Sequence, residues 1–299
     1  MTAGTCTILG IPVEIGARRV GCALAPDALR AAGLAASLKA QGYQIEDLGN
    51  MVCQDQPGPA VSDPYRRDWP LVVAWIKTIT AQIRRGVGNW PLLILGGDHV
   101  IAAGTLPGLA QHCQQAGQPM FVLWLDAHPD MHTLETTRSG NLHGVPMGYA
   151  LGQPGFDGFF PKLATPLLPE NVLMLGTRSI DPEEQQALAQ SHITVIDSVG
   201  LRTQGPTAAL SAFLQKVRAA NGHLHVSLDV DFLDPTLAPA VGTPVADGAN
   251  LQQVREITQV LQASGLVRSL EVAELNPLLD PGGETTRLVL ETIGQILHP

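Results

Sequence analysis

Short runs of apolar residues recur along the chain, and longer segments of helical period separate them. This alternation is typical of β-α-β units, so we expect an α/β fold around a central, mostly parallel sheet. About eight runs fit the strand pattern: residues 5–11, 44–48, 92–95, 120–125, 171–175, 193–196, 223–228 and 269–272.

Helix start signals follow most of these runs. Pro26 can occupy a first helical turn, Pro182 follows the capping residue Asp181, and Asn250 precedes a periodic segment. We expect helices to begin after Pro26, Asp68, His99, His143, Asp181, Pro206, Asn250 and Gly283.

Composition fits one ordinary globular domain covering residues 1–299. With 45% hydrophobic residues, a chain of 299 residues can bury a large core and does not need disulfides or structural metals to fold. The Pro-rich segments 54–63 and 152–169 are too short for linkers and are expected to be surface loops. A net charge of −9 argues against a nucleic-acid surface and mildly favours a cationic substrate.

Cysteine spacing and the N-terminal sequence indicate the compartment. Cys6, Cys22, Cys53 and Cys113 form no CxxC pair, so we expect free buried thiols rather than a zinc or redox motif. Residues 1–12 lack the order of a signal peptide, and no stretch has the apolar length of a membrane span. We therefore expect a cytoplasmic, soluble protein that has no membrane partner.

Polar clusters follow three of the predicted strands. In Gly96-Gly97-Asp98-His99, the glycines permit a sharp exit from the strand and leave His99 at a helix start. Taken alone, this motif is equally compatible with a capping Asp98 beside an idle histidine.

The other two clusters are acidic. Asp126, His128 and Asp130 alternate with small or apolar residues, as do Asp229 and Asp231. In an extended chain, side chains two apart share one face, so each set can converge on one point. Either cluster alone could be a solvated strand end. Together with His99, they would be costly to bury unless a cation compensated them.

The combined donors suit two metal ions. Four carboxylates and two imidazoles are too many anionic groups for one zinc ion, and structural zinc would bring thiolates. Oxygen-rich sets favour manganese, and two bridged ions can hold a hydroxide nucleophile at neutral pH. The sequence therefore predicts a hydrolase with these metal ligands: His99, Asp126, His128, Asp130, Asp229 and Asp231.

The same motifs resemble the signatures of the arginase or ureohydrolase family. The likeness covers nearly the whole chain in order and implies a three-layer α/β/α fold, two Mn²⁺ per subunit and a homo-oligomer, trimer or hexamer. The matching segments are GGDH at 96–99, DAHPD at 126–130, SGNLHG at 139–144, SLDVDFLDP at 227–235, and shorter stretches at 10–12, 16–31, 242–244 and 274–277.

The resemblance also implies roles. A metal-bridging hydroxide would hydrolyse the guanidinium group of L-arginine to L-ornithine and urea, with Asp126 and Asp229 bridging the ions. His143 matches the family's proton-shuttling histidine, and Glu274 the glutamate that pairs with the guanidinium group. Asp130 would assist proton transfer to the leaving amine.

Substrate choice depends on residues outside the metal shell. Ser139 and Asn141 match arginase positions that bind the α-carboxylate, which favours arginine over agmatine. Asp181 resembles the acid that reads the α-amino group, where Glu184 would assist, and Thr243 would contact the substrate.

Two positions depart from the family pattern. His132 stands where many arginases have Asn, although its imidazole can still donate to a carboxylate, so we retain it as a substrate-binding candidate. Asp247 replaces part of a Gly-Gly-Leu ending and could lie at the pocket rim or face solvent.

Three alternatives stay open. One is an agmatinase or another amidinohydrolase for a guanidino acid or formiminoglutamate. A dinuclear metallophosphoesterase would bring further His-rich motifs and a basic pocket, and neither is visible in the sequence. A non-catalytic metal-binding relative would usually have lost a metal, shuttle or guanidinium position.

Overall fold

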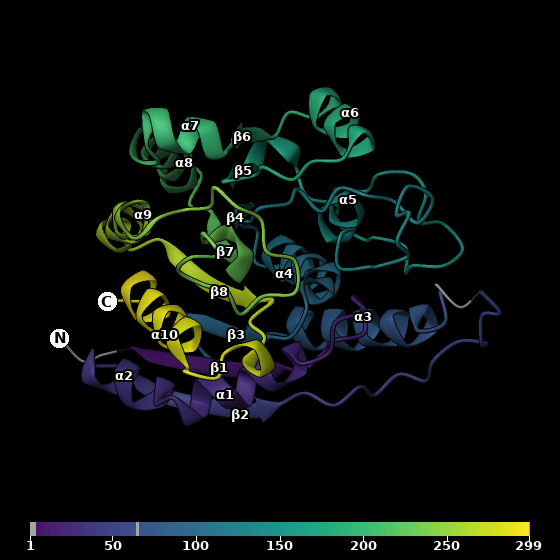
Figure 1. Ribbon diagram of the computed structural model, residues 1–299, viewed down its shortest axis with the longest axis horizontal. Coiled ribbons are helices and arrows are strands. Elements are labelled where there is room, and N and C mark those ends of the chain that lie inside the picture. Colours follow the sequence, from purple (N-terminus) through teal and green to yellow (C-terminus); the bar gives the residue numbers. More distant parts are fainter. Residues whose placement is uncertain (1–3, 64–65, 299) are drawn as a thin grey trace.

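All eight strands belong to one sheet. A computed structural model describes residues 4–63 and 66–298. The strand order is β2-β1-β3-β8-β7-β4-β5-β6, and each adjacent pair is parallel (Figure 1). The predicted strands are confirmed to within two residues at each end: β1 (Thr5–Ile11), β2 (Gln44–Asn50), β3 (Leu92–Gly96), β4 (Met120–Leu125), β5 (Val172–Leu175), β6 (Thr194–Ile196), β7 (His223–Asp229) and β8 (Val267–Ala273).

Both faces of the sheet are covered by helices. Successive strand side chains point to opposite faces, so Leu93 and Leu95 of β3 join one apolar core, and Leu92 and Ile94 join the other. One helical layer contains α1 (Ala25–Ala31), α2 (Leu34–Ala40), α7 (Ser198–Gln204), α8 (Thr207–Ala219), α9 (Leu251–Ser264) and α10 (Glu284–Ile296). The opposite layer contains α3 (Trp69–Arg84), α4 (Ala102–Gln115), α5 (Pro146–Ala150) and α6 (Pro182–Gln190).

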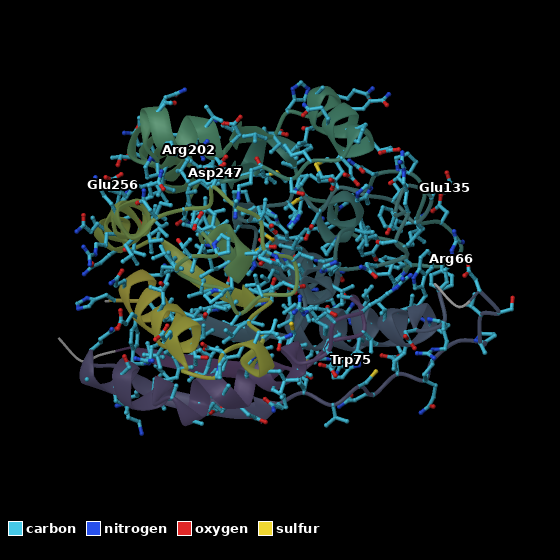
Figure 2. The ribbon with its side chains drawn as sticks, in the orientation of Figure 1. Arg66, Trp75, Glu135, Arg202, Asp247 and Glu256 are labelled. Carbon is cyan, nitrogen blue, oxygen red and sulfur yellow. The ribbon has the colours of Figure 1, made fainter. Side chains whose placement is uncertain are left out.

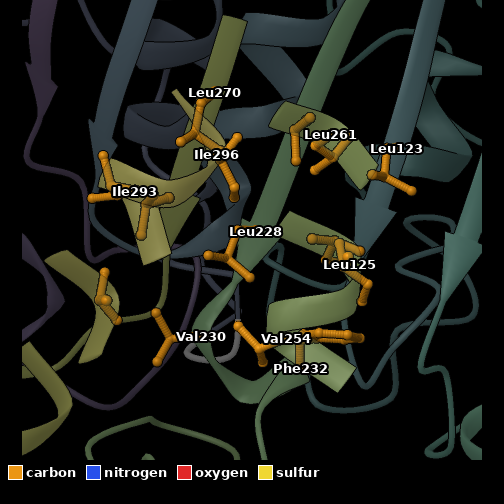
Figure 3. Close-up of a cluster of buried hydrophobic side chains, with 14 of the residues drawn as sticks. Leu123, Leu125, Leu228, Val230, Phe232, Val254, Leu261, Leu270, Ile293 and Ile296 are labelled. Atoms are coloured by element: carbon orange, nitrogen blue, oxygen red, sulfur yellow. The ribbon is translucent and has the colours of Figure 1, made fainter. Parts of the chain in front are cut away.

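Packing between the sheet and α9 and α10 illustrates how these layers hold together. Leu228 of β7 and Leu270 of β8 lie in one cluster with Leu261 of α9 and Ile293 of α10 (Figure 3). Each of the four is at most 1% exposed, and burying a side chain of this size contributes about 1.5–3 kcal/mol. The three-layer arrangement implied by the family resemblance is therefore present.

Local capping explains where two of the predicted helices begin. Asn250 Oδ1 accepts from the amide of Gln253 at 3.0 Å, and Gln253 Oε1 accepts from the amide of Asn250 at 2.9 Å. Asp181 occupies the N-cap of α6, and its amide donates to Glu184 Oε2 at 3.1 Å. These reciprocal bonds satisfy amides that have no partner within the helix.

Two helices were not predicted. Both α2 and α7 have only seven residues, and neither has the proline in its first turn that marks the equally short α1. The left-handed Gly33, with φ 95°, separates α2 from α1, and the sequence gives no apolar contrast across that break.

Two further expectations concern membranes and cysteines. Across residues 4–63 and 66–298, no helix combines the length and apolar character that a membrane crossing requires. All four cysteines are free, but Cys53 is half-buried, so the expectation of buried thiols is wrong for that residue.

The strand order sets the place of the site. The strands β3, β8, β7 and β4 are neighbours at the centre of the sheet, and their carboxyl ends meet at one edge. Ligands of open parallel sheets bind at this edge. Asp229 ends β7, the other predicted metal-binding residues follow β3, β4 or β7, and Glu274 follows β8.

Candidate active site

A buried histidine lies among three carboxylates at this edge. The Nδ1 atom of His99 is 3.1 Å from Asp126 Oδ2, 3.1 Å from Asp229 Oδ2 and 3.4 Å from Asp130 Oδ2. These side chains come from the ends of β3, β4 and β7, so the tertiary fold assembles the group.

A second donor group adjoins the first. The Nδ1 atom of His128 is 3.1 Å from Asp231 Oδ2 and 3.5 Å from Asp126 Oδ1. Asp126 thus directs one carboxylate oxygen to His99 and the other to His128. The donors form two sets, and within each set the ligand atoms lie within 4.8 Å of one another. One set is His99, Asp126 and Asp130, and the other is Asp126, His128 and Asp231.

Bends rather than extended chain produce this convergence. β4 ends at Leu125, and Asp130 lies beyond it with a left-handed φ of 52°. Asp231 lies in a 3-10 turn, where its amide donates to Asp229 Oδ1 at 2.8 Å. The expectation of an extended chain through both acidic clusters is therefore wrong, although the side chains converge as predicted.

The GGDH segment is fixed by close packing and by its aspartate. A Cβ atom on Gly97 would lie 1.8 Å from the carbonyl oxygen of Val13, so the position excludes any side chain. Asp98 accepts from the amides of Val100 at 3.1 Å and Gly16 at 2.6 Å. The capping role left open for Asp98 is confirmed, and the His99 side chain faces the carboxylates.

The donor atoms fit a bound cation. His99 Nδ1 and Asp126 Oδ2 are buried and have no hydrogen-bond partner among the described residues. Burial, together with neighbouring carboxylates, raises the pKa of Asp130 and Asp229 well above the usual value. Burial opposes a charged His99, yet Asp126 and Asp130 raise its pKa to about 9. Carboxylate oxygens and imidazole nitrogens are ligands that hard-to-borderline divalent ions accept, so this donor set fits such ions.

Glu274 and His143 form a pair beside the donor groups. His143 Nδ1 lies 2.9 Å from Glu274 Oε1, which also accepts from the amide of His99 at 2.9 Å. Glu274 is 1% exposed and has a φ of 65°, so it is not an ordinary surface acid. Although burial opposes ionisation, His143 lowers the pKa of Glu274. Burial likewise opposes protonation of His143, and Glu274 raises its pKa.

A pocket of about 350 Å³ opens onto His143 and part of the donor groups, whereas Glu274, His99 and Asp126 are not among its lining residues. Every predicted substrate-binding residue lines it, together with four of the predicted metal ligands and His143. The predicted substrate-binding residues are His132, Ser139, Asn141, Asp181, Glu184 and Thr243. Thr243 Oγ1 also donates to Asp231 Oδ2 at 3.1 Å. The structure thus gathers them, but it leaves their roles as predictions.

His132, which departs from the family pattern, is held between two acids. Its Nε2 atom is 3.2 Å from Asp181 Oδ2 and 3.6 Å from Glu184 Oε2, and its Nδ1 atom is 3.1 Å from Thr136 Oγ1. Glu184 is only 4% exposed. Both ring nitrogens of His132 therefore have partners, and a ligand in the pocket would compete with Asp181 for the hydrogen on Nε2.

Two arginines near the site were missed from the sequence. Arg138 lines the pocket and contacts Glu183, and its place directly before Ser139 was the only available signal. Arg178 donates to the carbonyl oxygens of Asp231 at 2.7 Å and Val245 at 2.9 Å, so it ties the donor turn to the segment after Thr243. Such backbone contacts leave no pattern in a sequence.

The second departure, Asp247, faces solvent. Its side chain is exposed, and it is not among the pocket-lining residues. Figure 2 shows Asp247 next to Arg202, whose Nη1 atom donates to the Asp247 carbonyl oxygen at 3.1 Å. The solvent-facing alternative is the one the structure supports.

The donor groups, the Glu274–His143 pair and the pocket coincide with the motifs of a known family. A family model described as "Arginase family" matches residues 4–298. The chain belongs to the arginase family. It is 47% identical to an arginase from Brucella melitensis, over 98% of this chain and 95% of that protein.

Solved structures agree with this assignment. A crystal structure of arginase from Bacillus subtilis superimposes with a TM-score of 0.84 at 32% identity, covering 99% of this chain and 98% of that one. The native arginase from Bacillus caldovelox also gives a TM-score of 0.84, at 31% identity, covering 99% and 98% of the two chains. The family resemblance found from sequence motifs is confirmed.

Proposed function

We propose that this arginase-family protein hydrolyses the guanidinium group of L-arginine to L-ornithine and urea. The observation that carries the proposal is the pair of donor groups sharing Asp126 and opening into the pocket. The 47% identity to a protein named arginase supports the choice of substrate.

The donor groups would hold two Mn²⁺ ions per subunit. His99, Asp126, Asp130 and Asp229 would hold one, and Asp126, His128, Asp229 and Asp231 the other. When bound, two such ions supply a nucleophile by making water acidic enough to ionise near neutral pH. The buried, unpartnered His99 Nδ1 and Asp126 Oδ2 support this assignment.

Three residues would manage charge and protons. Glu274 would bind the guanidinium group, whose planar donors suit a carboxylate. His143, 2.9 Å from Glu274, lines the pocket and would carry protons between solvent and the reacting amine. Asp130, which also lines the pocket, would assist protonation of the departing amine.

Selectivity for arginine would come from the pocket wall. Ser139 and Asn141 would bind the α-carboxylate, with the N–H group of His132 as a further donor. Asp181 and Glu184 would accept from the α-amino group. Agmatine lacks the carboxylate, so the donors on this wall would lose their partner with that substrate.

A side-by-side assay tests the function. The metal-free protein is loaded with Mn²⁺, and urea release is measured from L-arginine, agmatine and 4-guanidinobutyrate. We expect L-arginine to have the highest kcat/KM and the chelated protein to release no urea. Preference for agmatine would overturn the substrate assignment, and no urea from any of the three would reject the proposed function.

Three broader properties belong to the same proposal. A homo-oligomer, trimer or hexamer, is suggested by the family resemblance and would be tested by light scattering. The single sheet and the family match over residues 4–298 support one domain. Four free thiols are consistent with a reducing, cytoplasmic location.

A further inference from the structure

The two ring nitrogens of His99 have different surroundings. Nδ1 faces the carboxylates of the donor group, whereas Nε2 lies 2.9 Å from Ser227 Oγ. The ring stacks on Trp124 with centroids 4.2 Å apart and planes 5° apart, which restricts its rotation. In neutral imidazole only one nitrogen carries a lone pair, so the partner of Nε2 decides whether Nδ1 can bind a cation.

The Ser227 hydroxyl has a second partner that sets its direction. It donates its hydrogen to Glu271 Oε1 at 3.2 Å. Because a hydroxyl has one hydrogen, Ser227 can then only accept from Nε2–H of His99. When His99 is neutral, as an imidazole that binds a cation must be, its lone pair is therefore on Nδ1, which points at Asp126 and Asp229.

Sheet register brings these residues together. Ser227 of β7 pairs with Glu271 of β8, and both side chains are 0% exposed. Ser227 precedes Asp229 by two residues, so the serine and the donor carboxylate share a face of the strand.

The position of Glu271 is unfavourable for a carboxyl group, because the side chain is fully buried. Burying a carboxyl group is less favourable than burying an apolar residue of similar size. Glu271 is not among the pocket-lining residues, and none of the roles proposed above is assigned to it. A requirement to orient Ser227 does account for it.

We propose that Ser227 and Glu271 are positioning residues that hold His99 with its Nδ1 lone pair free for a divalent cation. This inference rests on the proposed two-ion function. The outer partners of metal-binding histidines fix the tautomer, and their loss typically lowers metal affinity about 10–100-fold.

Calorimetric titration of the metal-free protein with Mn²⁺ tests the inference without relying on turnover. In Ser227→Ala, we expect the ion held through His99 to bind about 10–100-fold more weakly, with the second ion unchanged. Combining Ser227→Ala with His128→Asn, which removes the other position, assigns the loss to the His99 group. The matched control is Ser269→Ala, an equally buried β8 serine that bonds His225 and should leave both affinities unchanged.

Variants at Glu271 keep the inference testable if Ser227→Ala folds poorly. Glu271→Leu leaves the Ser227 hydrogen free to turn toward Nε2, so it should weaken the same ion selectively. Glu271→Gln retains a carbonyl oxygen that can accept from Ser227 and should lie closer to wild type. Circular dichroism and thermal melting of each variant check the fold.

Defined outcomes separate this inference from the proposed function. Wild-type affinity for both ions in Ser227→Ala and in Glu271→Leu would overturn the inference, as would equal weakening of both ions. If the wild-type protein itself binds fewer than two Mn²⁺, the two-ion function fails first.

Discussion

Two site residues occupy backbone conformations that ordinary side chains avoid. Asp130 has a φ of 52° and Glu274 a φ of 65°. Each such residue costs of order 1 kcal/mol and persists only where the surroundings hold it in place. Here the strain turns Asp130 toward His99 and Glu274 toward His143, so the backbone helps to aim both acids.

His128 should be necessary for one metal position. His128→Asn removes the imidazole that lies 3.1 Å from Asp231 and leaves the His99 group intact. We expect one Mn²⁺ per subunit and a loss of urea release of at least about 100-fold, measured by calorimetry and a urea assay. His192→Asn, at an exposed histidine, is the control. Full activity with a single Mn²⁺ would reject the two-ion mechanism.

His132 should select for the α-carboxylate. A hydrogen bond to a charged group contributes about 1.5–3 kcal/mol, so His132→Ala should lower kcat/KM for L-arginine roughly 10-fold or more. Agmatine turnover should change little, because that substrate lacks the carboxylate. His132→Asn keeps a donor and should recover most of the loss. An equal fall for both substrates would contradict this role.

At the scale of elements, the central strands of the sheet position the residues of the site. The donors lie at the ends of β3, β4 and β7 or in the turns that directly follow them, and each of these strands is fully buried, so the sheet anchors their positions. The helices in the layer that contains α1, α2 and α7 to α10 contribute stability, and none of their residues lines the pocket.

The α9 cap offers a direct test of that separation. Asn250→Ala removes the side-chain oxygen that accepts from the Gln253 amide, and we expect about 1 kcal/mol less stability by urea denaturation. The control is Gln252→Ala, at an exposed position in the same helix, which should change stability by less than about 0.5 kcal/mol. The kcat/KM for L-arginine should be unchanged in both. Reduced catalysis in Asn250→Ala would show that the layers are coupled.

At the scale of the whole molecule, two histidines buried in β7 tie stability to pH. Burial lowers the pKa of both His223 and His225 to about 3, and neighbouring cationic groups add to the effect. In the unfolded chain each returns to about 6.5. Between pH 6.5 and 3 the unfolded chain therefore binds more protons, and the free energy of unfolding falls as the solution is acidified.

Replacing one of these histidines should flatten that dependence. His225→Leu removes a titrating group while Ser269 keeps its contact with His223 at 3.2 Å. Urea denaturation from pH 6 to pH 4 should give a slope smaller than wild type by about 1.4 kcal/mol per pH unit. His192→Leu, at an exposed histidine, should follow wild type. Parallel slopes for His225→Leu and wild type would contradict the expectation.

Local patterns in the sequence determined the fold class and the strands, and they predicted the candidate metal donors. The strands can be recognised in the sequence as apolar runs, because strands covered by helices on both faces must be apolar along their length. Polar residues that end such runs, such as Asp126 and Asp229, stand out for the same reason. The seven-residue helices α2 and α7 were not predicted, because they are too short to show a period and have no proline in the first turn to mark their start.

Only the tertiary structure decided which of these groups meet. The order β3-β8-β7-β4 brings His99 to Asp229, and it sets Glu274 against His143. The bends at Asp130 and Asp231 and the Ser227–Glu271 contact likewise had no local signal. Each depends on register and backbone turns between segments distant in sequence, and periodicity carries no information about such contacts.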